Sequence, residues 1–495
     1  MKKQSFLHGA AILAAASILC KIMSAALKIP LDRLYLHEEG IGIYQSAYSI
    51  YNVFLAFCVT GIPIALSSLI AGKDDEEAAT LTKSTCTAVS LLGALFGMLL
   101  FAFSTPIAKL LSGGDEAVCK SALITLSPAL LVMGVISSRK GFFQGKSIMT
   151  PSAIGQLGES LAKVILGIGL CAVFVKYGIA YGAAGAIAGV TAGALVQAIV
   201  LQIFYVRANK VRGEFSVKKA MEVIKVSIPM TLGAFGFTAV LLLDSLLVPK
   251  ILAGIGEDLA ERLKLMGYLT RSVTIYNLPA TIISAFTASA VPALAYAKAK
   301  SDGKTLGENS LRVIKLVFLA SLPCALGMML FSRENFVFIY STTSHWALLV
   351  LTGVMVMIMP YVQTTTAMLQ TMGRVWQPIL STVGAVLLKA VLNIFFVRAL
   401  GIFGAPVATI VSFAVAFIIN TVWLTKITKM NGALKEISKI LLCAVISCGG
   451  AWLVYSFIRT PWAFLLCLAL AVLVYFVLVF ASGCITKSEI LGKEE

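Results

Sequence analysis

Long apolar segments are the feature that most constrains how this chain folds. Fourteen of them follow one another along the 495 residues, separated by short polar stretches. Each holds about 20 residues or more, enough for an α-helix to cross the hydrocarbon core of a bilayer. Because backbone groups in lipid must bond to one another, the pattern predicts an all-α polytopic membrane protein with about 14 transmembrane helices. The segments are 7–31, 41–71, 85–111, 119–138, 152–175, 180–206, 221–249, 266–296, 309–331, 346–371, 377–397, 404–424, 437–457 and 462–484.

The charged residues support this interpretation and indicate the orientation. They make up only 13% of the chain, whereas a soluble protein carries about 25%. The formal net charge of +17 would suit nucleic-acid binding, but Lys and Arg gather in alternate loops, as the positive-inside rule describes. We therefore expect both termini in the cytoplasm and no nucleic-acid partner.

Two halves of the chain share one plan. FFQGKSIMTP from residue 142 matches MLQTMGRVWQP from residue 368, and LAKVIL from 161 matches LLKAVL from 387. Parallel repeats of this kind are related by an axis along the membrane normal, with substrate bound at their interface. The repeat therefore indicates a transporter that works by alternating access. We expect an N-lobe at 1–207 (spans 1–6), a cytoplasmic linker at 208–220, a C-lobe at 221–428 (spans 7–12), and spans 13–14 with a cytoplasmic tail at 429–495.

The first span carries a polar stripe. Seven residues make nearly two helical turns, so one face of this span presents Ser17, Lys21, Ser24 and Lys28. Such a stripe must face water or protein rather than lipid. Two plainer interpretations stay open: Lys28 reaches the nearby surface, and Lys21 forms a structural ion pair. Arg33 lies beyond the span, near the outer surface, and supports the stripe.

Span 8 supplies a further cation, Arg271, from the other lobe. If Arg271 and the stripe both face a central cleft, three cations meet there and imply an anionic substrate. Arg suits bidentate phosphate contacts and Lys acts as a point charge, so a phosphate or pyrophosphate is expected. The plainer alternative is an ion pair of Arg271 with an outer-loop acid, Glu257 or Asp258.

Two other pairs of charges lie within spans. Glu159 and Lys163 are four residues apart in span 5 and are expected to form a structural ion pair. Asp244 is an isolated acid in span 7, and its expected partner is Lys389 in span 11. That pair is either a static strut or a coupling switch that changes partners as the lobes rock.

No pattern in the sequence indicates catalysis or a cofactor. The three histidines lack metal-ligand spacing, and no nucleophile and base occur in a recognisable motif. We therefore expect no enzymatic activity, no metal site and no cofactor. The glycines of GAAGAIAGVTAG, from residue 182, recur every three or four residues and predict a close-packed helix face.

Two stretches resemble the stage V sporulation protein B family. They are KQSFLHGAAILAAASILCKIMSAALKIPLDRLYLHEEGIGIYQ near the N-terminus and RKGFFQGKSIMTPSAIGQLGES at 139–160. The resemblance extends over about residues 4–430 and is diffuse outside these motifs. This family is grouped with the lipid II flippases in the multidrug/oligosaccharidyl-lipid/polysaccharide (MOP) exporter superfamily. The resemblance implies a fourteen-span, two-lobe fold in the bacterial cytoplasmic membrane and export of undecaprenyl-pyrophosphate-linked saccharides.

The resemblance also implies roles for single residues. The central basic residues of the relatives fall on Lys21, Lys28 and Arg271. Some relatives bind sodium through an acid that matches Asp244. Lys389 lies in the matching part of span 11, where its ammonium would stand in for sodium. Coupling to the membrane potential, H⁺ or Na⁺ therefore stays open, with Na⁺ disfavoured.

Together, these features predict a flippase that moves a polyprenyl-pyrophosphate-linked saccharide, a lipid II-like precursor, from the inner to the outer leaflet. The expected partners are this lipid-linked oligosaccharide, membrane lipids and envelope-synthesis enzymes, with the protein working as a monomer. Two alternatives stay open, a cation-coupled multidrug exporter of the same superfamily and a non-transporting scaffold for envelope assembly. The sequence does not decide which saccharide is moved, or between a role in growth, sporulation or capsule.

Overall fold

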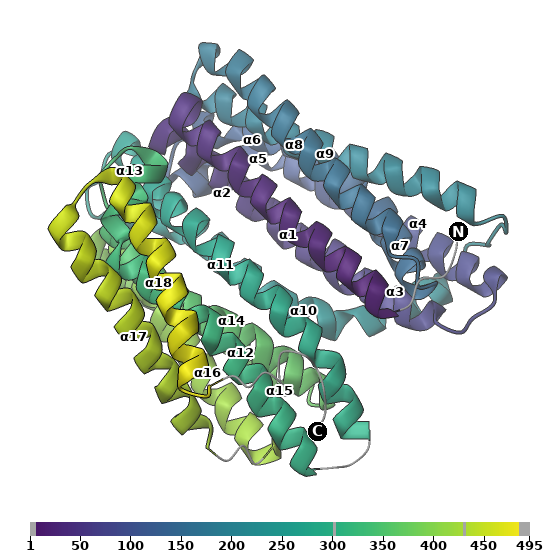
Figure 1. The fold of residues 1–495 in the computed structure, drawn as a ribbon. Coiled ribbons are helices and arrows are strands. Elements are labelled where there is room, and N and C mark those ends of the chain that lie inside the picture. Colours follow the sequence, from purple (N-terminus) through teal and green to yellow (C-terminus); the bar gives the residue numbers. More distant parts are fainter. Residues whose placement is uncertain (1–5, 300–302, 429–431, 485–495) are drawn as a thin grey trace. The chain divides into compact units, whose positions relative to one another are not determined.

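The computed structural model of the chain describes residues 6–299, 303–428 and 432–484 (Figure 1). These residues form helices and short connecting turns, without a strand. Contacts within the chain divide it into two compact units, residues 1–270 with 386–405 and residues 271–385 with 406–495. The all-α polytopic fold class is confirmed, whereas the lobe boundaries expected from the internal repeat stay a prediction.

The helices have the following bounds. The first unit contains α1 (Phe6–Pro30), η1 (Leu31–Leu36), α2 (His37–Leu55), η2 (Ala56–Gly61), α3 (Ile62–Ile70), α4 (Asp75–Ala102), α5 (Ser104–Ser112), α6 (Ala117–Leu131), α7 (Met133–Gly145), α8 (Thr150–Phe174), η3 (Val175–Tyr177), α9 (Ile179–Ala208), α10 (Val217–Gly254) and η4 (Gly401–Phe403). The second contains α12 (Gly303–Leu330), α13 (Ser332–Tyr340), α14 (Ala347–Thr371), α17 (Ala433–Ile458) and α18 (Pro461–Ala481). Three helices contribute residues to both units: α11 (Leu259–Ala299), α15 (Trp376–Leu400) and α16 (Gly404–Thr428).

Many of these helices are long and apolar enough to cross a bilayer. Within the described residues there are ten such helical stretches, or eleven if the pair α6 and α7, bent by 42°, is one span. The stretches 15–70 and 376–428 run for 56 and 53 residues. At 1.5 Å per residue each is about 80 Å long, more than the ~30 Å core requires, so each holds more than one crossing. The count of fourteen spans stays a prediction.

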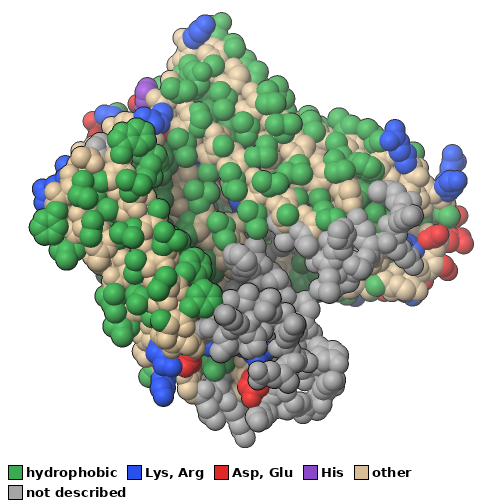
Figure 2. Space-filling model, viewed as in Figure 1, with side chains coloured by type: hydrophobic (Ala, Val, Ile, Leu, Met, Phe, Trp, Pro, Cys, Tyr) green, Lys and Arg blue, Asp and Glu red, His purple; other side chains and the backbone are tan. Residues whose placement is uncertain are grey.

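The surface of the helices is apolar. Large side chains such as Leu91, Ile165, Leu387 and Leu466 are exposed. Figure 2 shows hydrophobic side chains over wide areas of the visible face, with charged side chains gathered towards its margins. A soluble monomer rarely exposes a contiguous apolar patch larger than a few hundred Å². A surface of this kind is suited to lipid, as expected for a multi-pass membrane protein.

Helices α8 and α9 are the most closely packed pair of the first unit, and glycines make their close approach possible (Figure 1). A Cβ atom added to Gly189 would lie 2.4 Å from Cα of Gly167, and one added to Gly193 would lie 2.7 Å from the carbonyl oxygen of Glu159. The close-packed face predicted from the glycine spacing is therefore confirmed. The backbone carbonyls of Glu159 and Lys163 on α8 lie at this contact.

The connection between α9 and α10 lies against the start of α4. A Cβ atom on Gly213 would lie 2.3 Å from the carbonyl carbon of Ala79, so the two backbones nearly touch. The Lys219 ammonium donates to the Glu77 carboxylate at 2.7 Å, and this hydrogen bond raises the pKa of Lys219 above its usual value. The expected linker at 208–220 is thus held against the start of α4 in the first unit.

The contact between α8 and α9 yields a first prediction. Gly189→Ala forces the two helices apart and is expected to cost about 1–3 kcal/mol of stability, the usual cost of overpacking. Gly169→Ala, on α8, is the matched control, because no atom beyond its own helix lies within 4 Å of the added Cβ. Thermal unfolding in detergent measures both. Equal midpoints for the two variants would contradict the close contact.

Candidate functional site

Helix α1, which carries the polar stripe, packs on α8. The Ser17 hydroxyl donates to the Gln156 side chain of α8 at 3.5 Å, and the Ser24 hydroxyl donates to the Cys20 carbonyl of its own helix at 2.9 Å. The Lys21 side chain is exposed. Among the described residues, no carboxylate lies within ion-pair distance of the Lys21 ammonium. The plainer interpretation of Lys21, a structural ion pair, thus has no support in this part of the chain.

Lys28 turns toward protein groups of α2. Its ammonium donates to the Gln45 side-chain oxygen at 2.8 Å and lies 6.0 Å from the centre of the Tyr48 ring. Gln45 is buried and uncharged, so this contact orients the lysine without neutralising it. The electrostatic interactions of Lys28 within the described residues are repulsive, with Lys21 and Lys163.

Lys163 of α8 joins the same group of charges. It is 6% exposed, and its ammonium lies 3.3 Å from the Glu159 carboxylate and 5.8 Å from the centre of the Tyr48 ring. The expected pair of Glu159 and Lys163 thus forms, but it does not stand alone. Glu159 also attracts the buried Lys140 of α7 and the ammonium of Lys21.

The result is a surplus of positive charge inside the first unit. Four ammonium groups, those of Lys21, Lys28, Lys140 and Lys163, belong to this group of charges. Among the described residues, Glu159 attracts Lys21, Lys140 and Lys163, whereas Lys28 is repelled by Lys21 and Lys163. We call these five residues the cation cluster. Each charge in an apolar interior is costly unless it is paired, so the cation cluster favours binding of an anion.

Sequence reasoning missed the aromatic face beside these lysines. The rings of Tyr44 and Tyr48 stack with centres 5.6 Å apart, and Tyr51 continues the row at 5.7 Å. Spacings of four and three residues place the three rings on one face of α2, which is the signal that would have revealed them. Tyr48 lies between two lysines and offers its ring face to both, a contact worth about 0.5–2 kcal/mol.

Arg271 lies on α11 in the second unit and is 4% exposed. Its guanidinium carbon is 5.2 Å from the centre of the Tyr340 ring, and the Tyr340 hydroxyl donates to the Arg271 backbone carbonyl at 3.3 Å. One aromatic side chain thus holds both the side chain and the backbone of this arginine. The expectation that Arg271 meets Lys21 and Lys28 stays a prediction. Arg33 is exposed in η1, just after α1.

A second polar group surrounds Asp244 of α10. The Lys389 ammonium donates to Asp244 Oδ1 at 2.6 Å, and the Asn393 side chain donates to the same oxygen at 3.0 Å. Lys389 also donates to the Ala405 carbonyl at 3.5 Å. Lys389 and Asn393 are fully buried and Asp244 is 8% exposed. The ammonium of Lys389 thus pairs directly with this buried carboxylate.

The described residues contain no group of three or more His, Cys, Asp or Glu side chains that could hold a metal ion. The polar groups described above are cations, two carboxylates, amides, hydroxyls and aromatic rings. The structure thus defines a polytopic helical membrane protein with a cationic interior.

Comparison with known proteins identifies the family. The chain belongs to the polysaccharide biosynthesis protein family, whose model matches residues 6–298. In Bacillus subtilis (strain 168) it is similar to the uncharacterized membrane protein YabM (26% identity; 90% of this chain and 86% of YabM) and to stage V sporulation protein B (24%; 90% and 89%). It is also similar to the lipid II flippase MurJ of that strain (22%; 81% and 79%).

Solved structures agree with this assignment at the level of the fold. The lipid II flippase MurJ in an inward closed conformation matches with a TM-score of 0.76 at 16% identity, covering 98% of this chain and all of that one. An inward-facing multidrug resistance MATE transporter of the MOP superfamily matches with a TM-score of 0.70 at 16% identity, covering 85% and 99%. The predicted resemblance to stage V sporulation protein B and to lipid II flippases is confirmed, and the chain shares its fold with a transporter of the MOP superfamily. The apolar helices and these similarities show a multi-pass membrane protein.

The Asp244 group yields a second prediction. Lys389→Met leaves a buried carboxylate without its ammonium and is expected to cost about 3–5 kcal/mol. The double variant Asp244→Asn with Lys389→Met removes both charges and keeps a partner for Asn393, so most of the loss should be recovered. Thermal unfolding of the purified variants measures both effects. A double variant as unstable as Lys389→Met alone would contradict the pairing.

Proposed function

We propose that the protein flips a polyprenyl-pyrophosphate-linked saccharide, a lipid II-like precursor, from the inner to the outer leaflet by alternating access. The observation that carries this proposal is the positive surplus of the cation cluster, which Glu159 alone does not neutralise. A ligand that supplies negative charge removes the cost of that surplus. The similarity to a lipid II flippase and to stage V sporulation protein B supports a lipid-linked anion.

In this proposal Lys21, Lys28 and Arg271 hold the pyrophosphate. Lys21 is exposed and has no carboxylate partner among the described residues, so its ammonium is available to a ligand. Gln45 and Tyr48 hold the Lys28 ammonium in place. Arg271, positioned by Tyr340, adds the planar guanidinium that matches phosphate oxygens. The polyprenyl tail stays in lipid, and no covalent bond is made or broken, so we propose that the protein is not an enzyme.

The membrane potential supplies the driving force in this proposal. A charge that crosses the membrane changes free energy by about 2.3 kcal/mol per 100 mV. When an anionic head group leaves an inside-negative cell, its electrostatic free energy falls. The membrane potential therefore favours movement from the inner to the outer leaflet. The envelope-synthesis enzymes that make and use the lipid are the expected partners of a monomeric flippase.

Asp244 and Lys389 form the coupling element of this proposal. The ammonium at 2.6 Å from Oδ1 takes the position beside the carboxylate that a sodium ion would need. Asn393 donates to the same oxygen. Transport is therefore independent of sodium, and the pair acts as a switch whose contacts change as the unit moves.

The proposed pyrophosphate site yields a third prediction. Lys21→Gln, Lys28→Gln and Arg271→Gln each remove a charged hydrogen-bond donor, worth about 1.5–3 kcal/mol. Each should weaken retention of lipid II by about ten- to a hundredfold, measured by native mass spectrometry of the purified protein. Lys176→Gln is the matched control, because Lys176 is exposed in η3.

The outcomes separate the alternatives. Lipid II retention that none of the three substitutions weakens would contradict the proposed site. Preferential binding of a cationic dye over lipid II would support a multidrug exporter, whose fold this chain shares. Normal growth of cells that carry all three substitutions, with normal protein levels, would support a scaffold.

The proposed coupling yields a fourth prediction. In proteoliposomes, the rate of lipid II flipping should be unchanged when K⁺ replaces Na⁺ and should fall when the membrane potential is collapsed. The stable double variant Asp244→Asn with Lys389→Met should bind lipid II but flip it slowly, because its switch carries no charge. Flipping that requires Na⁺, or a rate unaffected by the potential, would refute the coupling.

A further inference from the structure

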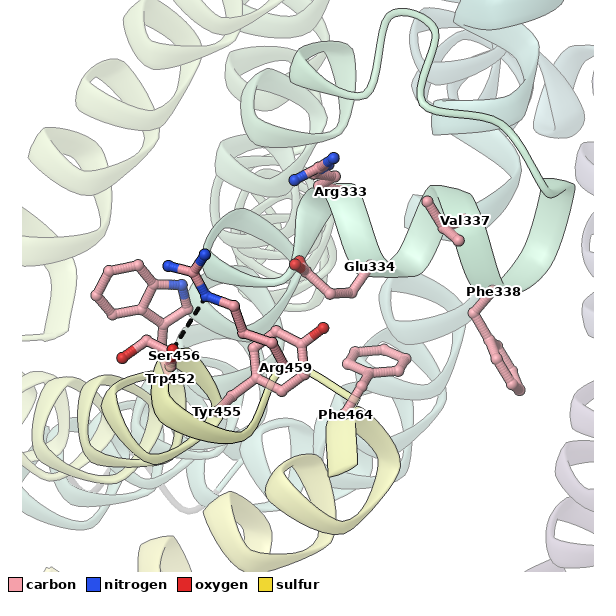
Figure 3. Close-up of a pocket in the computed structure, with 9 residues that line it drawn as sticks. All are labelled: Arg333, Glu334, Val337, Phe338, Trp452, Tyr455, Ser456, Arg459 and Phe464. Carbon is pink, nitrogen blue, oxygen red and sulfur yellow. Dashed lines mark hydrogen bonds between the residues drawn. The ribbon is translucent and has the colours of Figure 1, made fainter. Parts of the chain in front are cut away.

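The second unit contains a cavity of about 440 Å³ between α13, the end of α17 and the start of α18 (Figure 3). Its volume is within the range of small-molecule sites, about 300–1,000 Å³. It lies beyond the end of α12 and at the end of α17. In the topology expected from the positive-inside rule, spans 9 and 13 both end on the outer side, so the cavity opens at the outer surface of the membrane.

Charged side chains line this cavity without forming ion pairs. Arg333 and Glu334 project from α13, and Arg459 follows the last residue of α17 (Figure 3). Arg459 Nε donates to the Ser456 carbonyl at 3.0 Å, which anchors its side chain at the rim. Among the described residues, no carboxylate lies within 4.0 Å of either guanidinium. Two cations therefore face one anion, and the cavity has a surplus of one positive charge.

Aromatic rings connect the charged cavity to the lipid-facing surface. Phe464 lies at the centre of this wall, with its ring centre 6.0 Å from that of Phe338 and 6.5 Å from that of Tyr455. Phe338 and Trp452 are about half exposed, at 51% and 43%. Trp and Tyr concentrate at the level of lipid head groups, so this wall marks the membrane interface.

We propose that this cavity binds the head group of phosphatidylglycerol from the outer leaflet. Its phosphodiester lies between the guanidinium groups of Arg333 and Arg459, which are strong donors to phosphate oxygens. Its single negative charge offsets the surplus of the cavity, and its glycerol hydroxyls donate to Glu334. The acyl chains pass along Phe338 and Trp452 into lipid.

This site is separate from the proposed pyrophosphate site. None of its residues belongs to the cation cluster, and α17 and α18 lie outside the repeated spans 1–12 expected from the sequence. The inference therefore stands whether or not the protein flips lipid II. It assigns spans 13 and 14 the role of a contact between the second unit and an anionic lipid.

Native mass spectrometry of the full chain, titrated with phosphatidylglycerol, tests the inference. Arg333→Gln and Arg459→Gln should each weaken retention by about tenfold, since each removes a charged donor. Arg398→Gln is the matched control, an exposed arginine near the end of α15, and should change nothing. Glu334→Gln should strengthen retention, a gain that a loss of folding cannot produce.

Two further ligands decide the nature of the site. Phosphatidylethanolamine should be retained less than phosphatidylglycerol, because its ammonium cancels the charge that the cavity needs. Inorganic phosphate at millimolar concentration should not displace the lipid. Equal retention of phosphatidylglycerol by the wild-type protein and the Arg333→Gln/Arg459→Gln double variant would overturn the inference. Displacement by free phosphate, or equal binding of phosphatidylethanolamine, would also overturn it.

Discussion

The free energy of placing a charge in an apolar interior governs this structure. Lipid allows only structures whose backbone groups are all bonded internally. In the described residues of this chain these are helices, so a functional group within the membrane projects from a helix face into protein or water. A charge in that position is stable only when it has a partner. Asp244 has Lys389 and Asn393, and Lys163 has Glu159. The positions of these buried charged side chains are thus set largely by their ion-pair and hydrogen-bond partners.

The cation cluster departs from this rule, because its ammonium groups outnumber its one carboxylate, Glu159. Lys28 is held by an amide oxygen and an aromatic ring, which orient an ammonium but leave its charge in place. Lys21 is exposed along the same helix face. In the proposed function, these groups are available to an anion. By contrast, Asp244 has an ammonium and an amide as partners, which suits an element that holds or changes a conformation.

The fold alone does not decide what is moved. A lipid II flippase and a multidrug transporter both share this architecture with the chain at 16% identity. What distinguishes possible substrates is the sign of the charge in the interior. A cationic drug requires an acidic or aromatic site, whereas the lysines of α1, α7 and α8 favour an anion. The choice of substrate therefore depends on a few side chains and not on the helix bundle.

The sequence by itself determined the features that repeat along one helix. Apolar length predicted the helices, the turn of 3.6 residues placed Lys21 and Lys28 on one face, and the glycine spacing predicted a close-packed helix face from residue 182. Features that join distant helices were decided by the tertiary structure. Examples are the ring of Tyr48 near two lysines, the hydrogen bond from Asn393 to Asp244, and the cavity between α13 and α17. The physical reason is that periodicity fixes which face a side chain occupies, whereas its partner depends on how two helices pack.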